Sequence, residues 1–316
     1  MAIVTYQDKE YDIPKNASVL EALEAAGVDI SSSCRNGVCQ TCKMKATSGK
    51  LPAKAQEGLR LTEQEMGYFL PCVCYPTEDI VITNNDTISR YTVSVLSVTP
   101  LNDEIIEIKL THPEGFSYRS GQFIQLFKDP QHVRTYSLAS VPGKNEPLTL
   151  QVRVIPGGLI SPWLQTLSSG DEVSIAGPLG DCFYTNDRKD QPIVMIGTGS
   201  GLSPLYGILH DALLQNHEAD IYLFHGVVEK KSLYKETELR MLSEKFPQFQ
   251  YFPCLSNEKT DLHEYGMVLD VALKKSPTLK GARVFLCGHP EMVKTGRKKI
   301  FIAGAAMDDI YADPFG

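Results

Sequence analysis

The chain has 316 residues, of which 42% are hydrophobic and 22% charged, and its formal net charge is −7. This length suits two or three globular domains of about 100 residues each. The acidic balance and the absence of a basic segment argue against nucleic acid as a partner. No apolar run approaches the ~18 residues needed to span a bilayer, and residues 1–11 lack a signal-peptide pattern, so we expect a cytoplasmic protein without a membrane span.

The first segment, residues 1–86, begins with signals for a hairpin and a helix. Residues 3–6 alternate in polarity, a polar turn follows, and a second strand ends at Ile13. Ser18 and Glu21 then have the spacing of a capping box, and Gly27 is placed to end the helix. A hairpin followed by a helix and a cysteine-rich loop predicts a β-grasp arrangement.

Four cysteines in this segment have the spacing that plant-type ferredoxins use to hold a [2Fe-2S] cluster, namely Cys34, Cys39, Cys42 and Cys72. Two ferric ions, two sulfides and four thiolates sum to a dianion, which requires hydrogen bonds from nearby backbone amides. Gly37 permits the close backbone approach that such bonds need. Gln40 departs from the small residue expected there, so it either points outward or alters solvent access to the cluster.

Other uses of four cysteines fit less well. A zinc knuckle favours two matched C-x-x-C pairs, whereas Cys72 and Cys74 are one residue too close for the second pair. A Rieske centre needs two histidine ligands, and the first histidine of the chain is His112. Disulfides are not expected in a reducing compartment. A [2Fe-2S] cluster is therefore the preferred prediction.

The second segment, residues 90–188, changes to short alternating strands separated by proline and glycine. Strands are expected at 91–98, 105–110, 122–127, 148–154 and 172–176. Repeated strands at this spacing predict a small antiparallel barrel.

The third segment, residues 190–316, alternates buried apolar strands with amphipathic helices. Strands are expected at 192–196, 221–224, 250–254 and 284–287, with helices between them. This order predicts a doubly wound parallel sheet. The first strand runs into the glycine-rich turn 197–201, and such a turn at a helix N-terminus binds pyrophosphate through its amides and the helix dipole.

Four motifs carry a family resemblance, in the order Arg134-x-Tyr136-Ser137, Gly158-x-x-Ser161, the run 197–204 and the run 287–292. Their order and spacing are similar to those of ferredoxin-NADP reductase-like flavoenzymes. With the cysteine segment included, the whole chain resembles the three-domain reductases of bacterial aromatic-ring oxygenases, such as benzoate dioxygenase and phenol or toluene hydroxylase reductases. Reductases of deoxysugar dehydrases share this layout.

The resemblance implies a flavin site on the barrel. Arg134 would pair with the flavin phosphate, Tyr136 would pack on the isoalloxazine, and Ser137 would place its hydroxyl near flavin N5. Spacing of two residues places Arg134 and Tyr136 on one face of a strand. Gly158 and Ser161, with Gly157 beside them, would bind the FAD pyrophosphate at the start of a short helix.

The resemblance also implies a dinucleotide site in the third segment. The phosphates would lie against Gly197, Thr198, Gly199 and Gly201. Cys287, followed by Gly288, would end a strand beside the nicotinamide ring. Outside this motif, a single cysteine would be interpreted as a small buried residue of the hydrophobic core. Phe315 would be the aromatic residue near the flavin, although Gly316 after it departs from the usual ending.

These features together predict an NADH-dependent reductase. Hydride would pass from NADH to FAD, and single electrons would pass to the cluster and then to a separate acceptor protein, an oxygenase or hydroxylase component. Glu229, after the second strand of the parallel sheet, favours NADH, but Lys230 and Lys231 leave NADPH open. Two alternatives stay open: the same chain of cofactors serving a dehydrase, a quinone or a soluble carrier, and a metal-binding redox sensor without turnover.

Overall fold

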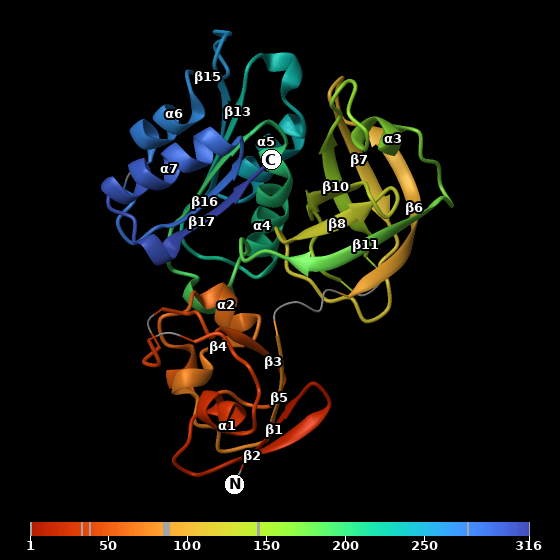
Figure 1. Ribbon diagram of the computed structural model, residues 1–316. Coiled ribbons are helices and arrows are strands. Elements are labelled where there is room, and N and C mark those ends of the chain that lie inside the picture. The colour runs from red at the N-terminus through yellow and green to blue at the C-terminus, as the bar shows by residue number, and fades with distance from the viewer. Residues whose placement is uncertain are drawn as a thin grey trace. The chain divides into compact units, whose positions relative to one another are not determined.

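The computed structural model describes residues 2–32, 34–37, 39–84, 89–143, 146–276 and 278–315. These residues form two compact units, Met1–Ile88 and Ser89–Gly316 (Figure 1). The expected linker around residues 84–86 lies, from residue 85 onward, outside the described residues. No helix in the described part of the chain is long and apolar enough to cross a membrane.

The first unit is a mixed sheet with a helix packed on it. The strands lie in the order β2-β1-β5-β3-β4, with β1 and β5 parallel and the other neighbours antiparallel. The strands are β1 Ala2–Tyr6, β2 Lys9–Ile13, β3 Met44–Ser48, β4 Tyr68–Phe69 and β5 Ile80–Thr83. The helical segments are α1 Val19–Ala25, η1 Ala53–Gln56, α2 Leu61–Glu65 and η2 Pro71–Val73. This arrangement confirms the predicted β-grasp fold.

Helix α1 has the ends that its sequence predicts. The Ser18 hydroxyl accepts from the Glu21 amide at 3.2 Å, and the Glu21 carboxylate accepts from the Ser18 amide at 2.8 Å. Gly27 has φ +82° beyond the last turn, and the Val28 amide donates back to the Leu23 carbonyl at 2.9 Å. Both ends satisfy backbone groups that the helix leaves unpaired.

The second unit begins with an antiparallel barrel. Its strands follow the order β10-β7-β6-β11-β8-β9, and the Ala139 amide donates to the Thr149 carbonyl at 2.8 Å, which joins the two ends of the sheet. Closure removes exposed strand edges. The barrel strands are β6 Arg90–Pro100, β7 Ile105–Leu110, β8 Phe123–Phe127, β9 Val133–Ser137, β10 Leu148–Arg153 and β11 Glu172–Leu179, with the short helix α3 Ser161–Gln165 between the last two.

A parallel sheet follows in the order β15-β14-β13-β12-β16-β17. Its strands are β12 Ile193–Thr198, β13 Ile221–Val227, β14 Phe249–Leu255, β15 Glu264–Tyr265, β16 Arg283–Gly288 and β17 Ile310–Pro314. Its helical segments are η4 Gly199–Gly201, α4 Leu202–Leu214, η5 Lys230–Ser232, α5 Glu236–Lys245, α6 Val268–Lys275, α7 Pro290–Ile302 and η6 Met307–Asp309. Another short helical segment, η3 Asn186–Arg188, precedes the sheet. The strand order reverses at β12, where ligands bind in sheets of this kind.

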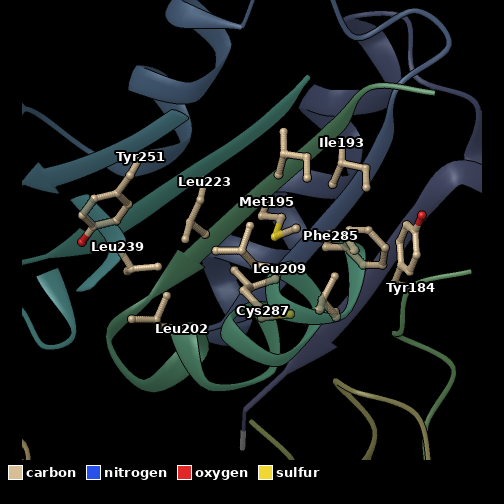
Figure 2. Close-up of a cluster of buried hydrophobic side chains, with 14 of the residues drawn as sticks. Tyr184, Ile193, Met195, Leu202, Leu209, Leu223, Leu239, Tyr251, Phe285 and Cys287 are labelled. Carbon is tan, nitrogen blue, oxygen red and sulfur yellow. The ribbon is translucent and has the colours of Figure 1, made fainter. Parts of the chain in front are cut away.

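Two apolar layers cover the faces of the parallel sheet. One includes Met195, Leu223 and Phe285 from the strands and Leu202 and Leu209 from α4 (Figure 2). The other contains Phe224 and Val284 together with residues of α6 and α7. Because both faces are buried, the strands read as continuous apolar runs in the sequence, which is why their positions could be predicted.

Helix α4 also contacts the barrel. The Ser203 hydroxyl donates to the Ser137 carbonyl at 3.2 Å, and a Cβ at Gly207 would lie 3.0 Å from the Leu138 carbonyl. The helix that begins at the glycine-rich turn is therefore packed directly against the end of β9. This contact brings the two halves of the predicted site together.

Candidate functional site

The four predicted cluster cysteines form two close pairs in the first unit. The Cys34 amide donates to the Cys39 sulfur at 3.4 Å, and the Cys39 amide donates to the Cys34 sulfur at 3.3 Å. The thiols of Cys42 and Cys72, both buried, interact with each other. The loop and η2 thus bring together residues that lie 30 positions apart.

The two pairs differ in their electrostatic surroundings. The Thr41 hydroxyl donates to the Cys39 sulfur at 3.2 Å and, with backbone amides, lowers the pKa of the Cys39 thiol to about 6. Burial instead raises the pKa of Cys42 to about 11. Hydrogen bonds that favour a thiolate are those that a cluster sulfur needs, so the Cys39 side of the loop is prepared for metal binding.

This arrangement fits a binuclear cluster better than a single zinc ion. Each iron of a [2Fe-2S] cluster takes two protein thiolates, and the structure supplies two pairs. Structural zinc instead takes four ligands around one centre. All eight cysteines are free thiols, so disulfides do not compete for these positions.

Gln40, the unusual residue of the loop, turns to a neighbouring segment. It has φ +58°, and its side-chain amide donates to the Gly58 carbonyl at 3.0 Å. Gly37, with φ +82°, lies against Val73, because a Cβ there would be 3.2 Å from a methyl carbon of that valine. The cysteine loop is thus held against both the backbone at Gly58 and the segment that carries Cys72.

The predicted flavin residues lie on β9 of the barrel. Arg134 and Tyr136 share one face of the strand, while Ser137 points to the other face and is buried. Arg134 is exposed, and its guanidinium donates to the Val133 carbonyl at 2.9 Å without an ion pair to another described residue. An exposed cation of this kind fits an anionic flavin phosphate.

The predicted pyrophosphate loop precedes α3. Gly157 has φ +75° and open space where a Cβ would be, and the Ser161 hydroxyl accepts from the Ile155 amide at 3.0 Å. Gly158 lies close to the same serine, since a Cβ there would be 3.5 Å from the Ser161 oxygen. The serine therefore holds its own loop in shape, and its hydroxyl hydrogen stays available to an acceptor.

The glycine-rich turn 197–201 consists of the last two residues of β12 and the segment η4 that precedes α4, at the switch point of the sheet. Gly199 has φ +53° and faces open space, which is compatible with a ligand close to its backbone. Gly201 is packed tightly, because a Cβ there would lie 2.3 Å from the Cys287 carbonyl. The turn is thereby fixed to the end of β16.

Thr198 and Gly288 join the ends of the same two strands. A Cβ at Gly288 would lie 2.5 Å from the Thr198 hydroxyl, and this hydroxyl accepts from the His289 amide at 2.9 Å. The Phe315 amide donates to the Gly288 carbonyl at 2.8 Å. Four of the predicted residues, Thr198, Cys287, Gly288 and Phe315, therefore meet where β12, β16 and β17 end.

Asp313 is a site residue that was not predicted. It lies opposite Cys287 in the pairing of β17 with β16, and its carboxylate accepts from the Ser137 hydroxyl at 3.0 Å. Its backbone also acts to lower the pKa of the Cys287 thiol, against the larger effect of burial. Asp313 therefore connects the predicted flavin residue of the barrel with the predicted nicotinamide residue of the sheet.

Burial governs the ionisation of this group. It raises the pKa of Asp313 to about 6, with the Ser137 hydrogen bond acting in the opposite direction. Burial also raises the pKa of the Cys287 thiol well above its ordinary value, and Cys182 lies 3.9 Å away, sulfur to sulfur. Cys287 is thus a neutral thiol in the apolar layer of Figure 2, adjoining a carboxyl group that titrates near neutral pH.

Comparison with known proteins assigns each part of the chain. Residues 3–77 match a 2Fe-2S iron-sulfur cluster binding domain, residues 91–184 an oxidoreductase FAD-binding domain, and residues 195–298 an oxidoreductase NAD-binding domain. The three matches run in the order that the sequence motifs predict. The chain is therefore an oxidoreductase with domains for a 2Fe-2S cluster, FAD and NAD.

Several known proteins align with this chain over nearly its whole length and nearly the whole of their own. The reductase subunit of an aromatic O-demethylase from Amycolatopsis sp. is 31% identical over 93% of this chain and 92% of its own length. A reductase component of naphthalene 1,2-dioxygenase and salicylate 5-hydroxylase systems from Ralstonia sp. is 31% identical over 95% and 93%. A crystal structure of an Amycolatopsis cytochrome P450 reductase has a TM-score of 0.69 at 28% identity and covers 100% of this chain and 99% of its own.

The chain belongs to this family of iron-sulfur flavoprotein reductases. It is an NAD(P)H-dependent electron-transfer reductase, as its motifs predict. The fold class, the three cofactor domains and the reductase class are confirmed, whereas the roles of individual site residues stay predictions.

Proposed function

We propose that this chain takes hydride from NADH onto FAD, passes single electrons to its [2Fe-2S] cluster, and delivers them to an oxygenase or hydroxylase component. The observation that carries the proposal is the group Ser137, Cys287 and Asp313, in which the end of a barrel strand meets the ends of β16 and β17. Flavin, when bound, supplies the conversion between two-electron and one-electron transfer. We assign the three functions to domains at 1–86, 90–188 and 190–316.

In this proposal, each residue where the barrel meets the ends of β16 and β17 has a physical task. Ser137 presents a hydroxyl whose direction is set by Asp313, and Cys287 presents a compact, uncharged sulfur in an apolar layer. Such a neutral surface excludes water from the place where the two rings would meet. Arg134 would balance phosphate charge, and Tyr136 and Phe315 would cover the flavin faces.

Two acidic side chains support NADH as the electron donor. Glu229 follows β13, and the carboxylate of Glu258, which follows β14, accepts from the Lys230 amide at 2.8 Å. Lys231 is paired with Glu229 at 3.0 Å, so its charge is already partly balanced. Carboxylates at the ends of these strands would accept ribose hydroxyls and repel a 2′-phosphate.

An oxygenase component as acceptor is supported by the relatives, which serve an O-demethylase, a dioxygenase with a hydroxylase, and a cytochrome P450 by name. The acidic chain fits a partner with a basic docking surface. Eight free thiols fit the reducing conditions of the cytoplasm.

The test is the visible spectrum of the purified protein under anaerobic conditions, with NADH or NADPH added. We expect flavin and iron-sulfur absorption that NADH bleaches at a much lower concentration than NADPH. Bleaching by NADPH alone would contradict the coenzyme assignment. Absence of flavin absorption, or failure of both nucleotides, would contradict the electron-transfer proposal as a whole.

The cluster ligands are tested with a pair of neighbouring cysteines. Cys72→Ser should remove the iron-sulfur absorption and the electron paramagnetic resonance signal of the reduced cluster while flavin stays bound. Cys74→Ala is the control: Cys74 is fully buried, burial raises the pKa of its thiol to about 12, and it packs in the apolar core. Retention of the cluster signal in the Cys72 variant would contradict the ligand assignment.

A further inference from the structure

His225 is a fully buried imidazole on β13. By alternation along the strand it shares a face with Ile221 and Leu223, which belong to the apolar layer under α4. A polar ring in this layer is costly unless its nitrogens are hydrogen-bonded. Its presence among apolar side chains therefore requires an explanation that packing alone does not give.

One ring nitrogen of His225 contacts the glycine-rich turn. Nε2 lies 3.0 Å from the Gly199 carbonyl oxygen, and Nδ1 lies 3.5 Å from the Tyr251 hydroxyl. Tyr251 comes from β14 and belongs to the apolar layer shown in Figure 2. The ring of Tyr234 meets the imidazole edge to face at 5.5 Å between centroids.

The tautomer of His225 follows from these contacts. Burial lowers its pKa to about 4, so the ring is neutral near pH 7 and carries one N–H. A carbonyl oxygen only accepts, so the hydrogen is on Nε2 and points to Gly199. The Tyr251 hydroxyl can then donate to Nδ1, which fixes the same tautomer.

This hydrogen bond holds the peptide between Gly199 and Ser200. The Gly199 carbonyl also accepts from the Leu202 amide, so it closes the first turn before α4. In a trans peptide the N–H points opposite to the C=O, and the Ser200 amide is therefore directed away from His225. Because Gly199, with φ +53°, has more conformational freedom than other residues, the bond from His225 adds to the Leu202 bond in holding this orientation.

We propose that His225 is a positioning residue for the dinucleotide phosphates, acting through the Gly199 carbonyl. The inference rests on the proposed role of the 197–201 turn in nucleotide binding and adds the side chain that orients its amides. His225 itself would not touch the nucleotide. Its removal lowers affinity for the nucleotide and leaves the chemistry of the bound complex unchanged.

The experiment compares His225→Leu with His225→Gln in the full protein loaded with FAD and cluster. Glutamine places an amide N–H near the position of Nε2, whereas leucine has no donor. NAD⁺ binding is measured by calorimetry on the oxidised protein, and KM for NADH and kcat are measured with ferricyanide as acceptor. We expect the leucine variant to bind NAD⁺ about tenfold more weakly and to have a KM for NADH about tenfold higher, with kcat nearly unchanged, and the glutamine variant to recover most of this loss.

Tyr234→Phe is the matched control. Its ring packs on the same imidazole, but its hydroxyl makes no hydrogen bond within the described part of the chain. NAD⁺ affinity should therefore stay at the wild-type value in this variant. Flavin and cluster absorbance check that each variant is folded and loaded.

Three results would overturn the inference. Wild-type NAD⁺ affinity in His225→Leu would show that the hydrogen bond does not act on binding. Equal losses in the leucine and glutamine variants would show that only the shape of the imidazole matters. If the wild-type protein bound no NAD⁺, the proposed nucleotide site would itself be wrong, and the role of His225 with it. If wild type binds NAD⁺ and the variants give either of the first two results, only the role of His225 is wrong.

Discussion

Asp313 is a partly buried carboxyl group whose neighbours come from distant parts of the chain. It receives the Ser137 hydroxyl from the barrel, and it pairs through the backbone with Cys287 on β16. Burial raises its pKa from 3.8 to about 6. The folded protein therefore binds a proton at this position under conditions where the unfolded chain has released it.

This shift predicts a dependence of stability on pH. Because the folded pKa is raised, the contribution of Asp313 is fully present below about pH 4 and is lost as the pH rises through 6. A shift of roughly two units corresponds to at most about 3 kcal/mol in the free energy of unfolding. Asp313→Asn should remove this loss, so its stability relative to wild type should increase between pH 4 and pH 7.

Urea unfolding of both proteins across this pH range measures the effect. Asp308→Asn, an exposed aspartate on η6, controls for the loss of one negative charge. Parallel pH profiles for wild type and Asp313→Asn would contradict a raised pKa at Asp313. Parallel profiles would mean that the pKa of Asp313 is the same in the folded protein as in the unfolded chain.

The sequence allowed some candidate site residues to be proposed and gave no signal for others, for a physical reason. Cys34, Cys39 and Cys42 lie in one short motif, and Ser137 and Cys287 lie in short motifs that carry the family resemblance, so they could be proposed from the sequence. Asp313 contacts a serine 176 positions away, and its position depends on β17 pairing with β16. No local pattern reports such a pairing, and only the nearby ending at Phe315 pointed to this segment.

At the scale of elements, the ends of β12 and β16 depend on glycine. Gly288 has φ +115°, and its Cα adjoins Thr198 so closely that a Cβ would lie 2.5 Å from the hydroxyl and 2.7 Å from the carbonyl oxygen. An alanine there would have to separate the two strand ends. We expect Gly288→Ala to raise KM for NADH at least tenfold, because the predicted nucleotide turn is attached to this contact.

Gly281→Ala is the matched variant for this prediction. Gly281 also has positive φ, +75°, but open space surrounds the position of its Cβ. It should lose about 1 kcal/mol of stability from the left-handed backbone alone, with KM for NADH unchanged. Steady-state kinetics and thermal unfolding of both variants separate steric crowding from backbone strain. Equal KM values in the two variants would contradict the crowding at Gly288.

Elements with strong patterns were predicted well, and short ones were not. Helix α1 has a capping box and a terminal glycine, and the central strands of the parallel sheet are continuous apolar runs. The two-residue strand β15 and the strand β17 after the last helix were not predicted. Both depend on a neighbour for their hydrogen bonds, so their own residues carry little signal.

At the scale of the molecule, the barrel and the parallel sheet form one compact unit. The segment that joins them, residues 185–191, is held by several contacts, one of which is a buried arginine on β16. The Arg283 guanidinium donates to the Thr185 carbonyl and hydroxyl, both at 2.8 Å, and to the Gln191 side chain at 3.2 Å. Arg283 is 1% exposed, so these bonds replace its hydration.

The fold class of each segment was predictable, but this attachment was not. Residue 283 begins a strand whose other residues are apolar, and an arginine at a strand end is usually read as solvent-exposed. Its partners lie about 90 to 100 positions earlier in the chain. The joint between barrel and sheet therefore depends on tertiary contacts that local patterns do not encode.

Arg283 consequently predicts how the second unit unfolds. Arg283→Met removes the donors and leaves the Thr185 carbonyl and the Gln191 amide oxygen without this partner, at a cost of about 1–3 kcal/mol. Arg283→Lys should recover only part of this, because one ammonium group cannot reach the same set of acceptors as a planar guanidinium. Lys298→Ala, an exposed site on α7, should change stability by less than about 0.5 kcal/mol.

Flavin fluorescence and far-ultraviolet circular dichroism during urea unfolding provide separate readouts of the barrel and of the whole fold. In wild type we expect both signals from the second unit to change together. In Arg283→Met the flavin should be released at lower urea than the main loss of helix, because α4–α7 belong to the parallel sheet and the barrel loses one of its attachments to it. Coincident transitions at the wild-type midpoint would mean that the other contacts between the two halves, such as Ser137 with Asp313, Lys235 with Glu107 and α4 with Leu138, are sufficient to hold them together.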